Sequence, residues 1–211
     1  MGGDNMSIFD LFGNKNSKSK KVDIKVSPVI MSDAKKNDKT AIALQNADSS
    51  YKEDKNLDKV ISTYESILDR CSGDTFNYQI KLSKYYVKAA RYDDAWRVLS
   101  KAQLDAIKRD QGNACTGQIR LEQFNVLKAE KRYKDAIVIL CCAFVVNNAS
   151  YGSWSRESLI KMAKPCAKGL TLSEESLEDI ADLVDRAVVN RDANEDRIPK
   201  AVSIYLEENG K

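Results

Sequence analysis

The sequence predicts an all-α protein built from antiparallel helical hairpins, and three observations support this prediction. Residues 82–102 carry two apolar stripes with the three- and four-residue spacing of helices that are buried on one side. The stripes are joined by residues 90–93, a turn so short that the two helices must be antiparallel neighbours. The 211 residues include only 3 prolines and 9 glycines, which leaves room for long helices. Because two short helices cannot bury their apolar faces alone, this hairpin needs further copies to pack against.

The chain supplies two further hairpins of the same kind. Residues 40–71 have apolar stripes on both sides of a turn at residues 53–56, and residues 112–147 have them on both sides of a turn at residues 130–133. When the hairpins are aligned at their turns, equivalent positions are occupied by Leu57, Tyr92 and Tyr133, by Val60, Ala95 and Ala136, and by Tyr64, Leu99 and Leu140. Ala95 is therefore expected where two helices cross closely, because only a small side chain fits such a contact.

The aligned hairpins have the character of a repeat. Equivalent positions are 35 residues apart between the first and second hairpins and 41 apart between the second and third. This pattern resembles the tetratricopeptide repeat, whose period is about 34 residues, although Asp48, Ser83 and Phe124 stand where that family prefers a glycine. The resemblance covers residues 40–147 and implies hairpins stacked as a short right-handed superhelical solenoid. It also implies a concave groove lined by the first helix of each hairpin.

The regions that flank the hairpins are expected to differ from them. Residues 1–39 are expected to be a flexible basic tail, because their small apolar clusters are separated by polar and basic residues. Residues 148–211 are expected to be a C-terminal helical capping region that covers the apolar end of the array. Within it, Thr171 followed by Glu174 forms a capping box that predicts the start of a helix. Seven to nine helices are expected from about residue 40 onward.

The composition excludes several kinds of catalytic and metal site. The chain has no histidine, so Ser–His–Asp and Cys–His arrangements are impossible. The common glycine-rich phosphate-binding loops are missing from the sequence. No C-x-x-C pair occurs among the cysteines, which are Cys71, Cys115, Cys141, Cys142 and Cys166. We therefore expect a protein that is not an enzyme and has no catalytic residue, metal ligand or cofactor.

Two features of the sequence bear on location. No run of about 18 apolar residues is present, and the N-terminal stretch lacks the apolar region and cleavage site of a signal peptide. A cytoplasmic location is expected.

Near the N-terminus, an apolar cluster precedes a lysine-rich segment, a pattern that suits an anionic membrane surface. The candidate membrane-contact residues are Ile8, Phe9, Leu11 and Phe12, but the stretch is much shorter than a typical interfacial helix, which favours a disordered leader or a cluster that docks onto the helices.

The charge distribution suggests the kind of partner. Residues 41–170 carry a net charge of +6, whereas residues 171–211 carry −6. Lys81, Lys84 and Lys88 are spaced three and four apart and share one helix face. The resemblance implies that this face lies on the groove side. The full set of groove candidates is Lys52, Lys81, Lys84, Lys88, Leu121, Asn125 and Lys128. The alternative is that these lysines form an ordinary solvated face.

The most consistent interpretation is a non-catalytic protein–protein interaction adaptor that binds a peptide or helix in the groove. Its basic character favours acidic or mixed acidic–apolar partners, and the acidic C-terminal segment makes self-association possible. The alternative interpretation is an accessory protein tethered to a membrane surface by the N-terminal segment. Nucleic acid is the weakest choice, because Tyr85 is the only exposed aromatic residue expected among the basic ones.

Overall fold

The computed structural model describes residues 28–71, 75–108, 112–151, 155–189 and 197–210. These ranges contain helices and no strand, which confirms the predicted all-α class and the expected number of helices. The nine helices of the described ranges are α1 (Pro28–Asp54), α2 (Leu57–Leu68), α3 (Phe76–Lys88), α4 (Tyr92–Lys108), α5 (Gly112–Ala129), α6 (Tyr133–Tyr151), α7 (Arg156–Gly169), α8 (Glu174–Val189) and α9 (Arg197–Asn209).

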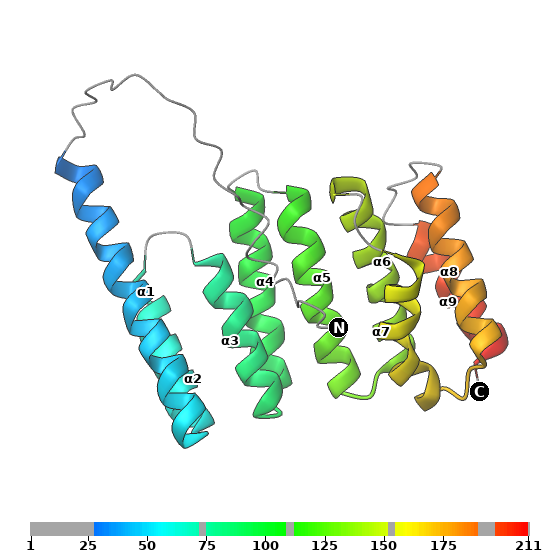
Figure 1. Cartoon of the computed structure of the whole chain (residues 1–211), viewed down its shortest axis with the longest axis horizontal. Helices are drawn as coiled ribbons and strands as arrows, with labels where there is room; N and C mark the ends of the chain where they lie inside the picture. The colour runs from blue at the N-terminus through cyan, green and yellow to red at the C-terminus, as the bar shows by residue number, and fades with distance from the viewer. Residues whose placement is uncertain (1–27, 72–74, 109–111, 152–154, 190–196, 211) are drawn as a thin grey trace, which may run out of the picture.

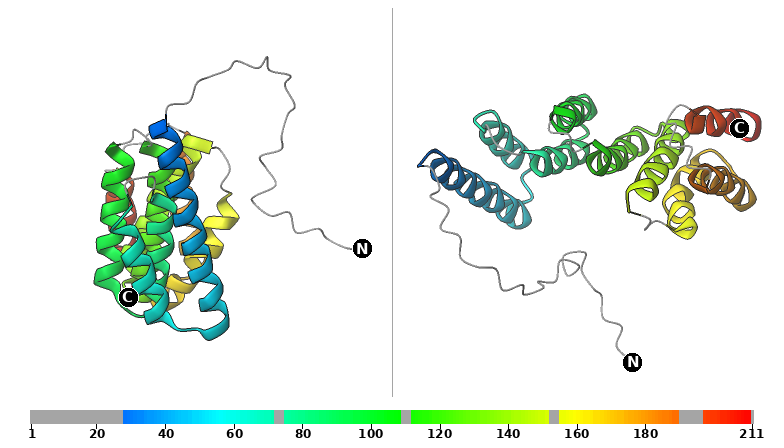
Figure 2. Two further views of the ribbon diagram at one scale, coloured as in Figure 1. Left: turned by 90° about the vertical axis from the view of Figure 1, so that its left-hand side faces the viewer. Right: turned by 90° about the horizontal axis from the view of Figure 1, so that it is seen from above.

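The helices lie side by side in a row that follows the order of the chain (Figure 1). Each helix packs against the next one, and α3 also contacts α5 while α6 also contacts α8 and α9. Seen from above, α1 and α7 lie on one side of the row, whereas α4 and α9 lie on the other (Figure 2). The two ends of the row are therefore formed by distant parts of the sequence, α1 at one end and α8 with α9 at the other.

The turns within the hairpins share one backbone feature, a residue with positive φ that is not glycine. These residues are Lys55 (φ 54°), Ala90 (φ 55°), Lys131 (φ 62°) and Thr171 (φ 53°). A left-handed residue just after a helix reverses the chain and lets the next amide groups reach the last free carbonyls. The first three turns match the turns predicted from the sequence, and the fourth joins α7 to α8 outside the three recognised hairpins.

Three of these turns are closed by the same long hydrogen bond. The amide of Arg91 donates to the Tyr86 carbonyl at 2.9 Å, and the amide of Arg132 donates to the Leu127 carbonyl at 2.9 Å. In the fourth turn, the Leu172 amide donates to the Ala167 carbonyl at 3.0 Å. The α7–α8 hairpin thus repeats the local geometry of the hairpins before it, although its sequence does not show their pattern.

We expect Ala90→Gly to stabilise the protein by about 0.5–1 kcal/mol, because glycine adopts positive φ without the steric cost that alanine bears. The matched control is Ala89→Gly, one residue earlier, where φ is −84° and glycine has no such advantage. That variant should lose about 0.5–1 kcal/mol through added freedom of the unfolded chain. Urea unfolding measures both, and a loss of stability in both variants would contradict the assigned turn.

The buried side chains form two clusters along the row. The first cluster joins α1 to α5 and includes Leu44, Tyr64 and Leu99, and the second joins α5 to α9 and includes Leu140. Trp96 on α4 packs against both clusters. Ala95 is fully buried in the first cluster, as expected for a close helix crossing.

Two local predictions are corrected by the structure, and a third concerns residues outside the described ranges. The first helix begins at Pro28, so the boundary placed at residue 39 falls inside α1; proline suits a first helical position, where its missing N–H has no partner to lose. The predicted capping box is wrong by two residues, because the Ser176 amide donates to the Ser173 hydroxyl at 3.0 Å, whereas Thr171 lies in the turn. The candidate membrane-contact residues, Ile8, Phe9, Leu11 and Phe12, lie outside the described residues.

Candidate functional site

A cleft of about 460 Å³ lies between α1 and α3, and its lining is strongly basic. Four lysines surround it, Lys52 on α1, Lys55 in the turn that follows α1, and Lys81 and Lys88 on α3. Asp48 is its one carboxylate. The uncharged side chains of the lining are Gln45, Ser49, Tyr51 and Tyr85. We call this region the basic cleft.

Asp48 is the buried anchor of the basic cleft. Its Oδ1 accepts hydrogen bonds from the hydroxyls of Tyr64 and Tyr85, each at 2.7 Å, and its Oδ2 pairs with Lys81 Nζ. These bonds tie α1, α2 and α3 together. Burial alone would raise the pKa of Asp48, but the hydrogen bonds from Lys81, Tyr85 and Tyr64 outweigh it and lower this pKa. Asp48 is therefore ionised at neutral pH, which is the form that can accept all three donors.

The two tyrosines that bond to Asp48 are fixed as donors. Burial raises the pKa of Tyr64 and of Tyr85 well above the ordinary tyrosine value, and the hydrogen bond to the Asp48 carboxylate raises each pKa further. Both hydroxyls keep their protons throughout the physiological range. The arrangement is therefore structural, a charged acceptor held by neutral donors and one ammonium group, rather than a pair of groups poised to exchange protons.

Aromatic rings hold the lysines at one end of the basic cleft. Lys88 Nζ lies 5.0 Å from the ring centre of Tyr51 and 5.3 Å from that of Tyr85. Lys55 Nζ lies 5.7 Å from the Tyr51 ring, and the two rings pack edge to face at 5.1 Å. Within the described part of the chain, Lys52, Lys55 and Lys88 have no carboxylate partner. Their N–H groups are available to an acidic ligand, since a contact with a ring face, as Lys55 and Lys88 make, leaves the N–H groups unpaired.

The remaining predicted groove residues lie along α3 and α5, outside the lining of the basic cleft. Lys84 pairs with the buried carboxylate of Glu122 at 3.0 Å, and Asn125 Nδ2 donates to the other oxygen of Glu122 at 3.1 Å. Lys128 Nζ lies 4.8 Å from the ring centre of Phe124. Leu121 packs against the second cluster of buried side chains. Of the seven predicted residues, the basic cleft brings together Lys52, Lys81 and Lys88.

Sequence reasoning missed Lys55 and the acidic and aromatic part of the basic cleft. Tyr85 was expected to be exposed, but its exposed fraction is 6%, because it packs between Tyr51 and Tyr64 and bonds to Asp48. One signal was present in the sequence. Asp48 falls on the same helical stripe as the apolar residues Leu44 and Tyr51, and a carboxylate on a buried stripe requires partners from other helices.

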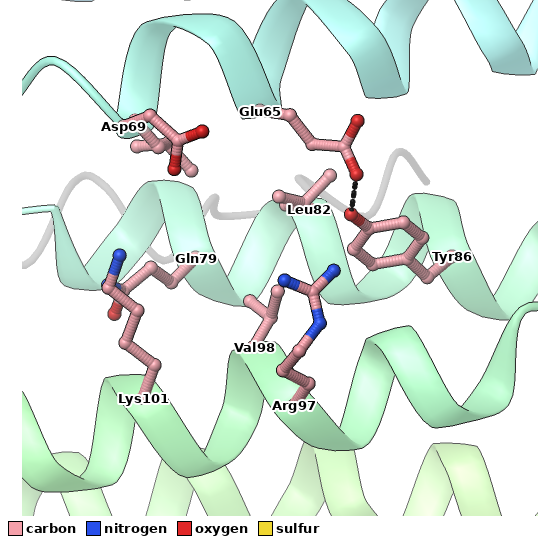
Figure 3. A pocket seen from close by; sticks show the side chains of 9 residues that line it. Glu65, Asp69, Gln79, Leu82, Tyr86, Arg97, Val98 and Lys101 are labelled. Atoms are coloured by element: carbon pink, nitrogen blue, oxygen red, sulfur yellow. Dashed lines mark hydrogen bonds between the residues drawn. The ribbon is translucent and has the colours of Figure 1, made fainter.

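A smaller hollow of about 90 Å³ lies between α2, α3 and α4 (Figure 3). At one end the Tyr86 hydroxyl donates to Glu65, and at the other end Asp69, Gln79 and Lys101 lie together. Its acidic and basic side chains are equal in number, Glu65 and Asp69 against Arg97 and Lys101. This hollow therefore does not select for the sign of a ligand's charge, as the basic cleft does.

Comparisons with known protein families, with curated proteins and with solved structures found no match. Among the described residues, no group of cysteine, aspartate and glutamate side chains is arranged to hold a metal ion. In the same ranges, no helix is both long enough and apolar enough to cross a membrane.

Proposed function

We propose that this chain is a non-catalytic protein-interaction module that binds an acidic or mixed acidic–apolar peptide or helix in the basic cleft. The observation that carries the proposal is the set of lysines without a carboxylate partner, Lys52, Lys55 and Lys88, beside the rings of Tyr51 and Tyr85. Carboxylates of a ligand pair with the lysines, while its apolar side chains contact the half-buried ring of Tyr51.

The same proposal includes the architecture suggested by the sequence. We infer a short right-handed superhelical solenoid of the tetratricopeptide-like kind, with its concave face lined by the first helices of the hairpins, α1, α3 and α5. The shared turn geometry at Lys55, Ala90, Lys131 and Thr171 supports a repeated unit, and it extends the repeat to the α7–α8 hairpin. The free cysteines support a reducing compartment such as the cytoplasm.

The strength of binding follows from the kind of contact. An exposed ion pair contributes about 0.2–1 kcal/mol, so three or four of them hold a ligand only weakly unless apolar contacts with the tyrosines add to them. Screening over about 10 Å at 0.1 M salt weakens such pairs further. We therefore expect reversible, salt-sensitive binding in which the lysines select the charge of the partner and the rings add affinity.

The test is fluorescence anisotropy with a labelled helical peptide rich in glutamate and leucine, and with the same peptide carrying glutamine in place of glutamate. Lys52→Glu/Lys88→Glu should weaken binding of the acidic peptide about tenfold or more at low salt, because two attractions become repulsions. The matched control is Lys101→Glu/Lys108→Glu, which changes the net charge equally on the exposed surface of α4. Equal weakening by both pairs would reduce the effect to net charge and contradict the proposed site.

A further inference from the structure

The far end of the row carries an acidic stripe. Glu178, Asp182 and Asp185 lie on one face of α8, spaced four and three residues apart. All three pair with the single guanidinium of Arg156 on α7, at 2.7 Å for Glu178 and 2.9 Å for Asp185. One positive charge cannot balance three carboxylates, so the stripe keeps an excess of two negative charges.

The acidic stripe is accessible as well as charged. The side chains of Glu178, Asp182 and Asp185 are 54%, 49% and 53% exposed. Each carboxylate has two oxygens and several acceptor positions, and one guanidinium has only five N–H donors. The stripe therefore retains acceptors that point to solvent while Arg156 fixes their positions.

The acidic stripe and the basic cleft carry opposite net charges. The basic cleft has four lysines and one aspartate, a net charge of +3, against −2 for the stripe with Arg156. Of the four lysines, Lys81 is paired with Asp48, so the charge available to a ligand comes from Lys52, Lys55 and Lys88. These three ammonium groups and the excess carboxylates of the stripe attract each other.

The two surfaces cannot meet within one chain. The basic cleft lies between α1 and α3 at one end of the row, and α8 lies at the other (Figure 1). We propose that the occupant of the basic cleft is α8 of a second copy of this chain, so that copies associate head to tail. This inference rests on the proposed function, because it names the acidic helix that the cleft binds.

Head-to-tail contacts have a consequence for assembly. A head-to-tail pair still offers a free cleft on one copy and a free stripe on the other, so the contact is heterologous and adds further copies until a ring closes or an open chain forms. Because the contact is mainly electrostatic and solvent-exposed, association is weak, rises with protein concentration and falls with salt.

Sedimentation velocity of the full chain tests the inference. At about 20 mM salt the weight-average sedimentation coefficient should rise with concentration, and at about 500 mM salt it should not. Lys52→Glu/Lys88→Glu, which reverses the cleft, and Asp182→Lys/Asp185→Lys, which reverses the stripe, should each abolish the rise. Glu207→Lys/Glu208→Lys is the matched control at the same end of the row, on exposed positions of α9, and should retain it.

The decisive step is to mix the two reversed variants in equal amounts. Each reversed surface then meets its complement on the other variant, so association at low salt should return to at least half of the wild-type rise. Restored association also shows that both variants are folded. If wild type does not associate at low salt, or if the mixture stays monomeric while circular dichroism shows both variants folded, the inference is wrong. Binding of the acidic peptide by wild type in that case leaves the proposed function standing, whereas failure of both removes the basic cleft as a binding site.

Discussion

Asp48→Asn should lower the free energy of unfolding by about 2–3 kcal/mol at neutral pH. The carboxylate accepts from two buried hydroxyls and pairs with Lys81, and hydrogen bonds to a charged group contribute about 1.5–3 kcal/mol each to stability. An asparagine amide offers one acceptor oxygen and places donor hydrogens against the other donors, so at least one buried hydroxyl loses its partner. Urea unfolding measures the loss. Tyr85→Phe, which removes one of the bonds, should cost about 1.5–3 kcal/mol.

The stability loss of Asp48→Asn should depend on pH, whereas a loss caused only by altered packing should not. The folded-state pKa of Asp48 lies below the ordinary aspartate value of 3.8, so its contribution to stability is complete above that value and is lost as the pH falls through the folded-state pKa. The stability difference between wild type and Asp48→Asn should therefore be constant from about pH 5 to 8 and shrink below about pH 4. Asp69→Asn, at an exposed position, is the control and should show little difference at any pH. A difference that grows on acidification would contradict the assigned network.

Ala95→Leu should destabilise the protein by about 1–3 kcal/mol through overpacking. Ala95 has no exposed surface and lies in the first buried cluster. A leucine must displace neighbouring side chains or push α4 away from them. Ser100→Leu adds the same side chain to the exposed face of α4 and should stay within about 0.5 kcal/mol of wild type. Chemical denaturation compares the two, and a neutral result for Ala95→Leu would mean that the hairpin is packed differently.

The sequence was most informative about features that depend on a single helix or turn, such as the position of a turn and the buried face of a helix. The three turns that contain Lys55, Ala90 and Lys131 were placed correctly, because short polar breaks between two apolar stripes leave few alternatives. The burial of Ala95 followed from its place on a stripe, since periodicity reports which face of a helix is covered. These features depend on residues that are close in the chain.

The basic cleft was less predictable because its character depends on residues that are far apart in the chain. Lys81 was expected to face a ligand, but Asp48 from another helix takes up its charge, and Glu122 does the same for Lys84. Charge spacing along one helix reveals which lysines share a face and not which carboxylates approach that face from its neighbours. The ends of helices were also difficult, since Thr171 and Ser173 both suit a helix start and only the backbone geometry distinguishes them.

The most direct test of the central claim, that the basic cleft receives an acidic helix, is an NMR titration of the full chain with the acidic peptide at low salt. We predict that shifts of the backbone amides and of the tyrosine ring signals concentrate at the cleft, around Tyr51, Lys52 and Lys88, and disappear in Lys52→Glu/Lys88→Glu. Shifts that instead concentrate on α4 or on the hollow beside Tyr86, with the cleft signals unmoved, would contradict the claim.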